Sequence, residues 1–194
     1  VARKKRVPFV LEVRDLWPDA PAARGLIRGW QSLPLHWMAD RLYRSADRIV
    51  SLTPGIKREL VKKGIEARKV DVFPNGLDPE LFDLADGTRE AVRQRYGWGT
   101  DFVAIYTGAH AQSVAVEVIV RAAHALKNRK DIRFELFGHG HMKGSLMLLA
   151  KDLGLTNIRF HDPVPKSQVV GLLAAADVAL MCLHKKPFSL DVQF

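Results

Sequence analysis

The sequence predicts an α/β protein made of two halves, each built from parallel βαβ units and each incomplete. Short runs of β-branched, aliphatic and aromatic residues alternate with longer segments of helical periodicity along the 194-residue chain. Strands separated by helical segments of about 10 to 15 residues are typical of parallel sheets. The alternation is interrupted once, between Pro74 and Thr100, where proline, glycine and aspartate interrupt the pattern. We therefore expect two domains joined by a linker.

The first half, residues 1–76, is expected to contain three strands with helices between them. The strands are runs rich in β-branched and other apolar residues, at Pro8–Val13, Arg48–Leu52 and Lys69–Phe73. A helix is predicted from about Trp30 to Ser45, because apolar residues recur there at helical spacing, namely Leu35, Met38, Leu42 and Ala46. A second helix starts with Thr53 as N-cap and Pro54 in its first turn, and Gly64 ends it.

The segment 77–100 is the expected linker, with one short helix from Arg89 to Tyr96 inside it. Thr88 is its predicted cap and Gly97 its stop. The second half, residues 101–194, resumes the alternation. Its expected strands are Phe102–Tyr106, Ile132–Phe137, Ile158–Phe160 and Val178–Leu183, and its expected helices are Val114–Leu126, Met142–Leu153 and Ser167–Ala176. A doubly wound domain usually has five or six strands, so each half is predicted to be part of a larger domain.

The charge of the chain is distributed unevenly. The formal net charge is +9, from 30 Lys and Arg against 21 Asp and Glu. Residues 1–70 hold 16 of the basic and 7 of the acidic residues, so the whole excess lies in the first third. Three explanations are compatible with this excess of basic residues. They are a solvated basic face, contact with an anionic membrane surface, and binding of a phosphorylated acceptor. Nucleic acid is not an expected partner, because no binding motif or interleaved stacking aromatics accompany the charge.

Composition also excludes several classes of protein. No apolar run approaches the about 20 residues that span a bilayer, so no transmembrane helix is expected. The single cysteine, Cys182, cannot form an intramolecular disulfide, fits a reducing compartment and is expected to pack in the core. No secretory signal is expected at the N-terminus. We therefore predict a cytoplasmic protein, peripheral at the inner face of the plasma membrane.

Three loops of the second half are candidates for a ligand site. They follow predicted parallel strands, and ligands of open α/β sheets bind where such strands end. These loops are Thr107–His110, Gly138–Lys143 and Asp162–Pro165. Their glycines let the backbone approach a ligand closely, and Lys143 offers a charge for a phosphate. Strand-to-helix turns that simply need glycine are the alternative interpretation.

Other residues carry weaker signals. His139 and His141 lack a nearby carboxylate or cysteine set, so a metal site is not expected. Asp15 ends the first predicted strand, where its carboxylate could act as a general base or orient a substrate hydroxyl. A salt bridge with Arg14 or Arg41 is an equally plausible role for this carboxylate. Two tryptophans at helical spacing are expected to be core or interface aromatics: Trp30 and Trp37.

Seven motifs follow one another along most of the chain: Glu12–Pro18, Ala46–Gly55, Pro74–Phe82, Tyr106–His110, Leu136–Gly140, Ile158–Lys166 and Leu172–Val178. In this order they resemble the family 4 retaining glycosyltransferases, most of all the bacterial sugar transferases of O-antigen and capsule assembly. The resemblance implies two Rossmann-like βαβ domains of the GT-B type. It also implies that a nucleotide-sugar donor binds the second domain and that the acceptor binds the first.

Carried over position by position, the resemblance implies a donor site in the second half. Gly108 and His110 match residues beside the donor diphosphate. Gly138, Gly140 and Lys143 match residues that border the nucleotide. The donor is a substrate, so neither a cofactor nor a metal is implied.

Two further matches complete the implied site. Val164 and Pro165 match residues that contact the base of the nucleotide, and Asp15 matches a motif that faces the active cleft, with Arg14 where many relatives have His. We therefore take Asp15 as the candidate catalytic residue. The arginine and lysine with which many relatives grip phosphates are missing from Ala111–Val114.

The resemblance implies transfer of a hexose or N-acetylhexosamine to a lipid-linked or saccharide acceptor in cell-surface polysaccharide synthesis. The family's acceptor loop would precede Val1, and its paired glutamates would follow Phe194, so we expect this chain to be an inactive fragment. One alternative is a non-catalytic remnant that binds a membrane or a partner. Another is a GT-B sugar-nucleotide epimerase, against which the Asp15–Pro18 stretch argues.

Overall fold

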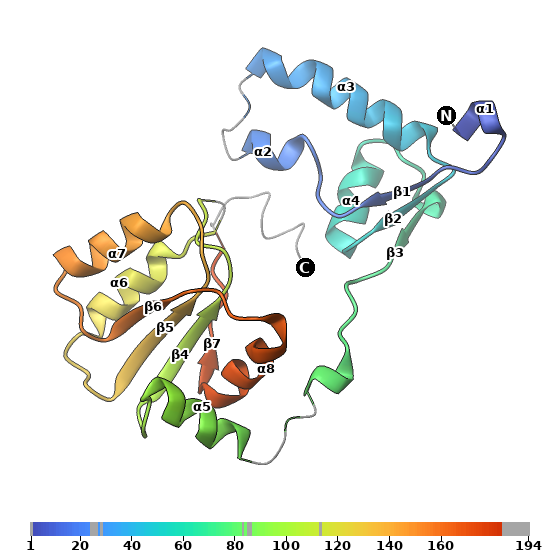
Figure 1. Ribbon diagram of the computed structural model, residues 1–194. Coiled ribbons are helices and arrows are strands. Elements are labelled where there is room, and N and C mark those ends of the chain that lie inside the picture. The colour runs from blue at the N-terminus through green and yellow to red at the C-terminus, as the bar shows by residue number, and fades with distance from the viewer. Residues whose placement is uncertain are drawn as a thin grey trace. The chain divides into compact units, whose positions relative to one another are not determined.

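The computed structural model describes residues 2–23, 27, 29–82, 84, 87–112 and 114–183. These residues form two compact units, which divide between Leu77 and Asp78 (Figure 1). Each unit contains one sheet, and all strand pairs in both sheets are parallel. The predicted α/β class is therefore confirmed.

The first unit has a three-stranded sheet in the order β1-β2-β3. In chain order its elements are α1 (Ala2–Lys5), β1 (Val10–Val13), α2 (Asp19–Ala23), α3 (Gly29–Ser45), β2 (Arg48–Ser51), α4 (Pro54–Lys62), the 3-10 turn η1 (Ala67–Lys69) and β3 (Val70–Val72). The register pairs Val10 with Arg48 and Ile49 with Val70. The short helices α1 and α2 were not expected from the sequence.

The core of the first unit joins residues of all three strands to residues of α3 and α4. It is formed by Val13, Leu16, Ala39, Tyr43, Ala46, Ile49, Ile56, Leu60, Ile65 and Val70. The predicted inward face of α3 was wrong in two positions, because Met38 and Leu42 are exposed and Ala39 and Tyr43 are buried instead. The Tyr43 ring packs in the core, and its hydroxyl donates a hydrogen bond to the Trp17 carbonyl at 3.1 Å. The buried polar group of this side chain therefore has a partner.

The second unit has a four-stranded sheet in the order β6-β5-β4-β7. Its elements are η2 (Pro79–Phe82), α5 (Thr88–Tyr96), β4 (Phe102–Thr107), α6 (Glu117–Ala125), β5 (Ile132–Phe137), α7 (Lys143–Asp152), β6 (Ile158–His161), α8 (Lys166–Ala175) and β7 (Val178–Ala179). The chain runs outward from β4 to β6 and then returns to place β7 on the other side of β4. The sheet is therefore doubly wound, and the order reverses at β4.

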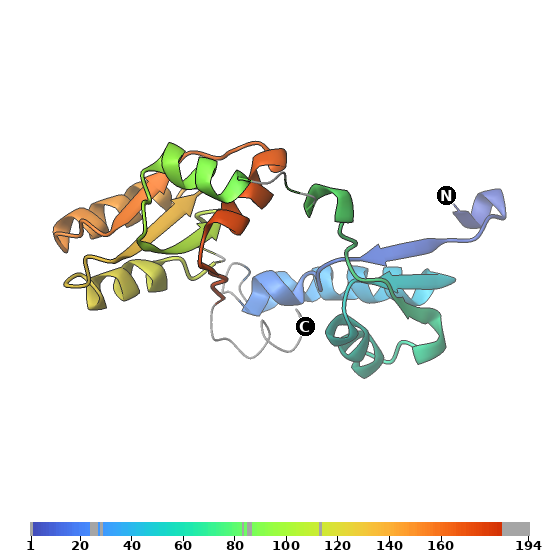
Figure 2. The same ribbon diagram turned by 90° about the horizontal axis from the view of Figure 1, so that it is seen from below.

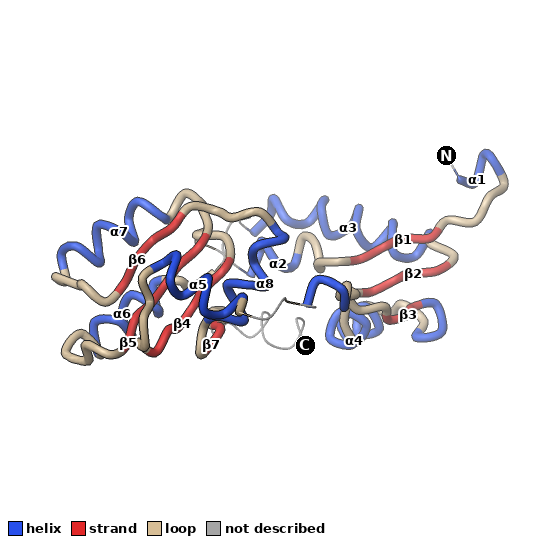
Figure 3. Tube along the Cα trace, turned by 60° about the horizontal axis from the view of Figure 1, so that its bottom comes forward, coloured by secondary structure: helices blue, strands red, loops and turns tan. Residues whose placement is uncertain are grey.

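Helices cover both faces of this second sheet (Figures 1, 2 and 3). On β4, Ala104 and Tyr106 belong to a core shared with α6 and α7. The alternate residues Val103 and Ile105 belong to a second core, shared with α8 and with Trp98 after α5. Because strand side chains alternate between faces, a strand buried on both sides is almost wholly apolar, which explains why β4 was evident in the sequence.

Three further findings bear on the sequence expectations. The short helix expected inside the segment 77–100 is α5, and its Arg89 and Arg93 bind Asp177, next to β7 of the second unit, at 2.7 and 3.3 Å. The last strand was predicted to reach Leu183, but β7 ends at Ala179. Within the part of the chain that the structure describes, no helix combines the length and apolar character needed to cross a membrane.

Candidate functional site

The carboxyl ends of β4, β5 and β6 bring the three predicted loops together in the second unit. A cavity of about 330 Å³ lies there, within the range of small-molecule sites. It is lined by Thr107, Gly108, Ala109, Phe137, Gly138, His139, Pro163, Val164 and Val169. The loop after β4 lies where the strand order reverses, which is the position at which open α/β sheets bind their ligands.

Two glycines let these loops lie directly against each other. A Cβ on Gly138, whose φ is +146°, would lie 1.9 Å from the carbonyl oxygen of Gly108. A Cβ on Gly140, whose φ is +156°, would lie 2.3 Å from the carbonyl oxygen of His110. Any side chain at either position would collide with backbone, so both glycines are required by the close approach. This requirement is a structural one, and contact of the two glycines with a ligand stays a prediction.

Backbone hydrogen bonds fix the two glycine-containing loops together. Gly108 N–H donates to the Phe137 carbonyl at 3.0 Å, and His110 N–H donates to the His139 carbonyl at 2.9 Å. The His110 carbonyl accepts in turn from the N–H of Met142, just before α7, at 3.0 Å. The floor of the cavity is thus a hydrogen-bonded backbone unit rather than a pair of separate loops.

The ammonium group of Lys143 is occupied by protein oxygens in this structure. It donates to the carbonyls of His161 at 2.7 Å and Gly138 at 3.1 Å, and it pairs with Asp162 Oδ1 at 2.8 Å. This hydrogen bond and charge hold the pKa of Asp162 below its usual value. Lys143 therefore ties the β5 loop to the β6 loop, and its contact with a donor phosphate stays a prediction.

His110 is completely buried beneath the cavity. Its ring packs near Tyr106 and Phe160, with ring centroids 5.8 and 6.1 Å away. Neither ring nitrogen has a hydrogen-bond partner among the described residues. Burial, assisted by the nearby Lys143 and His139, lowers the pKa of His110, which keeps the ring neutral. The contact between His110 and a donor diphosphate stays a prediction.

The residues predicted to contact the nucleotide base lie at the start of α8. Val164 lines the cavity, and Pro165 is the N-cap of α8 with φ −53° and ψ 145°. Besides α8, the helices α6 and α7 also begin at this edge of the sheet. Helix N-termini present free N–H groups and positive dipole ends, so this edge favours a negatively charged ligand without a cationic side chain.

A polar cluster beside the cavity was missed from the sequence. Glu135 on β5 is fully buried and hydrogen-bonds the His161 ring, and its other oxygen lies 3.6 Å from Arg133 Nη1. The His161 ring stacks on Phe137 with centroids 4.3 Å apart, and Phe137 lines the cavity. A single glutamate inside the apolar strand Ile132–Phe137 was the available signal.

In the first unit, Asp15 lies just after β1 and is exposed. Among the described residues its carboxylate has no hydrogen bond or ion pair, so neither the Arg14 nor the Arg41 salt bridge is formed. Arg14 instead donates to Asn75 Oδ1 at 3.1 Å and lies 3.7 Å from Glu12. Asp15 is thus a free carboxylate at a strand end, and its catalytic role stays a prediction.

Two other sequence expectations are resolved. The core interpretation of Trp30 and Trp37 was wrong, since they are 79% and 66% exposed on α3. Cys182 packs against the core shared by α6 and α7, as expected, and burial raises the pKa of its thiol. Among the described residues, no three His, Cys, Asp or Glu side chains lie together as a metal site would require.

Comparisons with known proteins agree with this geometry. The family model described as "Glycosyl transferase 4-like domain" matches residues 1–76. The model described as "Glycosyl transferases group 1" matches residues 88–193, more than half of the chain. The chain belongs to the group 1 glycosyltransferases. This confirms the family expected from the seven motifs.

Individual group 1 relatives are similar over most of this chain. A D-inositol 3-phosphate glycosyltransferase of Kineococcus radiotolerans is 30% identical over 185 residues, which cover 89% of this chain and 40% of that protein. WcaI of Escherichia coli K12, named as a putative colanic acid biosynthesis glycosyl transferase, is 25% identical over 178 residues, covering 89% of this chain and 44% of WcaI. The chain thus spans less than half the length of these two relatives.

The fold is also shared with solved glycosyltransferase structures. HepE of Anabaena, crystallised with UDP-glucose, has a TM-score of 0.75 at 18% identity, over 93% of this chain and 48% of that one. WaaG, a glycosyltransferase involved in lipopolysaccharide biosynthesis, has a TM-score of 0.73 at 20% identity, over 89% of this chain and 49% of WaaG. At these identities the likeness shows the fold, which is of the predicted GT-B type.

Proposed function

We propose that the second unit of this group 1 glycosyltransferase chain binds the nucleotide part of a nucleotide-sugar donor. An enzyme that contains this unit would transfer a hexose or N-acetylhexosamine, with retention of configuration, to a lipid-linked or saccharide acceptor. The acceptor would bind the first unit. The single observation that carries the proposal is the cavity of about 330 Å³ at the point where the strand order of the second sheet reverses.

The chemistry of the cavity suits a nucleoside diphosphate. Val164, Val169 and Pro163 supply an apolar wall for a planar base. Gly108 and Gly138 also line the cavity, and because they carry no side chain the diphosphate can approach the backbone closely there. HepE was crystallised with UDP-glucose, which agrees with this class of donor.

Transfer from such a donor requires stabilisation of the negative charge that builds up on the leaving diphosphate. The relevant groups here are the N-termini of α6, α7 and α8 at the carboxyl edge of the sheet. Asp15, exposed after β1, is the proposed catalytic carboxylate, with a role in orienting an acceptor hydroxyl. Synthesis of a cell-surface polysaccharide is the proposed setting, in agreement with the name of WcaI.

Binding of nucleotides by calorimetry tests the donor proposal directly. UDP and GDP are titrated into the chain, into the Val164→Trp variant and into the Leu148→Trp variant. The first substitution fills the cavity, whereas Leu148 is exposed in the middle of α7 and is a matched control. We expect saturable binding of at least one nucleotide, lost in V164W and kept in L148W. Absence of binding by the unsubstituted chain, or equal binding by both variants, would refute the proposal.

The proposed peripheral membrane contact is carried by α3. This helix exposes several large apolar side chains: Trp30, Leu33, Trp37, Met38 and Leu42. Arg41 lies over the Trp37 ring at 5.6 Å, and Arg44 follows one turn later on the same helix. Aromatic and aliphatic side chains interleaved with arginine are typical of helices that lie in the interface of anionic bilayers. The occupant proposed for this face is therefore an anionic lipid surface.

Vesicle sedimentation tests this contact. The chain is expected to sediment with vesicles containing phosphatidylglycerol and not with pure phosphatidylcholine vesicles. The Leu33→Ser/Trp37→Ser variant should stay in solution, and the control Val61→Ser/Phe73→Ser, which changes exposed apolar residues of the same unit outside α3, should sediment. Equal sedimentation of both variants would refute the role of α3. Sedimentation without any nucleotide binding would favour the non-catalytic alternative.

A further inference from the structure

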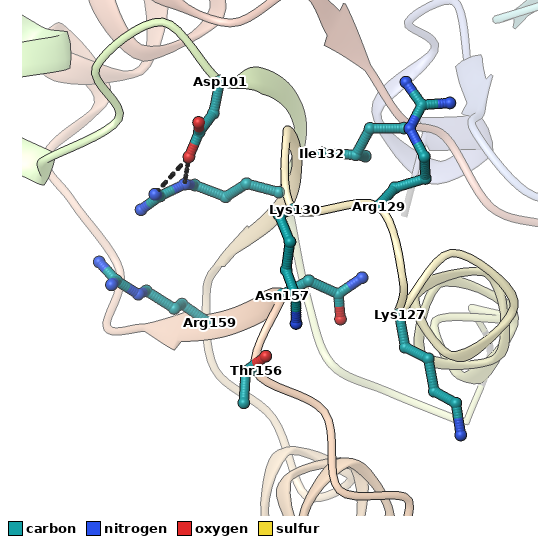
Figure 4. A pocket seen from close by; sticks show the side chains of 9 residues that line it. Asp101, Lys127, Arg129, Lys130, Ile132, Thr156, Asn157 and Arg159 are labelled. Carbon is teal, nitrogen blue, oxygen red and sulfur yellow. Dashed lines mark hydrogen bonds and ion pairs between the residues drawn. The ribbon is translucent and has the colours of Figure 1, made fainter.

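A second pocket of the second unit lies at the amino ends of its strands, the edge opposite the donor cavity. Its volume is about 150 Å³, and Figure 4 shows the side chains that surround it. The lining residues come from the segment before β4, the connection from α6 into β5, and the loop into β6. They are Asp101, Lys127, Arg129, Lys130, Ile132, Arg133, Thr156, Asn157 and Arg159.

The pocket carries far more positive than negative charge. Five of its lining side chains are Lys or Arg, and Asp101 is the single acid among them. Asp101 is committed to Arg133, which donates to Asp101 Oδ2 from Nη2 at 2.6 Å and from Nε at 3.2 Å, as the dashed lines in Figure 4 mark. Arg129 is paired with Asp131 at 2.6 Å. Two of the five cations are thus neutralised.

The remaining cations have nothing to bind within the described part of the chain. The side chains of Lys127, Lys130 and Arg159 make no hydrogen bond or ion pair with any described residue. Figure 4 shows Lys130 directed toward Thr156 and Asn157, with Arg159 on the other side, while Lys127 extends away from the centre. Arg133 is not among these uncommitted cations, because it binds Asp101 and its Nη1 lies 3.6 Å from Glu135 Oε1. Three uncommitted cations therefore border the pocket, and the acceptors among its lining side chains, Asp101 and Asn157, bind none of them.

Stabilisation of helix ends does not explain all of this charge. Basic residues beyond the C-terminus of α6 interact favourably with the helix dipole, which accounts for Lys127 and its neighbours in sequence. Arg133 and Arg159 lie on the strands β5 and β6 instead, and their side chains reach the same pocket. Residues from three separate segments converge, as they do in a ligand site.

We propose that this pocket binds a phosphate-type oxyanion, held mainly by Lys130 and Arg159, with the Thr156 hydroxyl as a further donor. A guanidinium fork and an ammonium are the groups that recognise tetrahedral oxyanions in proteins. The volume is too small for a nucleotide, since sites for drug-sized ligands begin at about 300 Å³. No aromatic residue lines the pocket for base stacking, so nucleic acid does not fit it.

This proposal does not depend on the donor cavity, because the two sites lie at opposite edges of the sheet and share no lining residue. The same oxyanion chemistry is offered by inorganic phosphate, by a phosphorylated small molecule and by a lipid headgroup. The source is therefore a question for the experiment, which uses inorganic phosphate and pyrophosphate in one arm and phosphatidic acid vesicles in another.

The experiment is a titration of the isotopically labelled chain, followed by amide chemical shifts at constant ionic strength. Inorganic phosphate or pyrophosphate should produce saturable shifts at residues 127–133 and 156–159. Lys130→Gln and Arg159→Gln should each weaken binding about tenfold, as expected for the loss of one charge-assisted contact. Lys151→Gln removes one exposed charge from α7 outside the pocket and is expected to bind as tightly as the unsubstituted chain.

Each outcome decides the question. Saturable shifts at both segments that weaken in K130Q and R159Q support the site. Vesicle binding that weakens in the same two variants also supports it and identifies a headgroup as the source. Shifts confined to the Gly108 and Gly138 loops, an equal effect of K151Q, or no saturation with any of the probes would overturn the proposal. Nucleotide binding measured on the same variants reports separately on the donor cavity.

Discussion

At the scale of single residues, the buried carboxylate of Glu135 is held by two basic groups. It hydrogen-bonds His161 and lies 3.6 Å from Arg133 Nη1, with no solvent exposure. We expect Glu135→Leu to lower the free energy of unfolding by about 3 kcal/mol, because it leaves buried partners unpaired. Urea denaturation measures this loss, and Glu135→Leu/His161→Leu should recover part of it.

The Glu117–Arg121 pair supplies the control for this prediction. It is an i,i+4 ion pair on α6, with side chains 49% and 69% exposed. Exposed pairs contribute little, so Glu117→Leu should change the free energy of unfolding by less than about 1 kcal/mol. If Glu135→Leu lowered the free energy of unfolding by no more than Glu117→Leu does, the buried ion pairs of Glu135 would not stabilise the fold.

His110 makes stability depend on pH. Burial lowers its pKa in the folded chain, so below the unfolded value of about 6.5 the unfolded chain binds the additional proton. This contribution to stability is complete above a pH of about 6.5 and is lost progressively as the pH falls toward the folded pKa. His110→Phe replaces the imidazole by a ring that has no nitrogens to protonate. The free energy of unfolding of this variant, measured by denaturation from about pH 8 to about pH 5, should therefore fall less with pH.

Leu148, which is exposed on α7, gives the matched variant. Leu148→Phe introduces the same ring at a position that does not titrate and should leave the pH dependence of unfolding unchanged. An unchanged pH profile in H110F would show that His110 does not retain its neutral form on folding.

These residues also show what the sequence can reveal about the site. Gly138 and Gly140 were recognisable because glycines directly after a buried strand indicate that the backbone there must approach another group closely. The pairing of Glu135 with His161 depends on the register between β5 and β6, which no local pattern specifies. The three acceptors of Lys143 could not be predicted from the sequence for the same reason, because they come from two different loops.

At the scale of elements, α4 begins with a complete N-cap. Thr53 has φ −137° and ψ 156°, and its side-chain oxygen accepts from Ile56 N–H at 3.1 Å. We expect Thr53→Ala to lower the free energy of unfolding of the first unit by about 1 kcal/mol. Thr53→Ser retains the oxygen and should cost much less in the same denaturant series. Equal losses in both variants would mean that the methyl group, not the cap, is responsible.

The helix α3 shows where periodicity is insufficient. The apolar positions Met38 and Leu42 fit a 3.6-residue period as well as the buried Ala39 and Tyr43 do, so the pattern alone selects no face. Tertiary packing selects the face with the small Ala39, which lets α3 approach the sheet. The strand β4 was predicted more reliably, because it is covered on both sides and is apolar at consecutive positions.

At the scale of the whole molecule, the two units differ in how they are stabilised. The first has three strands of three or four residues and one joint core. The second has helices and apolar cores on both faces of its sheet. Because stability follows the apolar surface removed from water, the first unit should unfold at the lower temperature. Calorimetry is expected to show two transitions rather than one.

The fluorescence of tryptophan assigns the two transitions. Trp98 is fully buried in the second unit, whereas Trp30 and Trp37 are exposed in the first. Emission should therefore shift to longer wavelength mainly in the upper transition, when Trp98 meets water. A nucleotide that binds the donor cavity stabilises the folded form by mass action, about 2.7 kcal/mol at a hundredfold excess over Kd, and should raise the upper transition alone. A single transition that shifts as a whole would show instead that the units unfold as one.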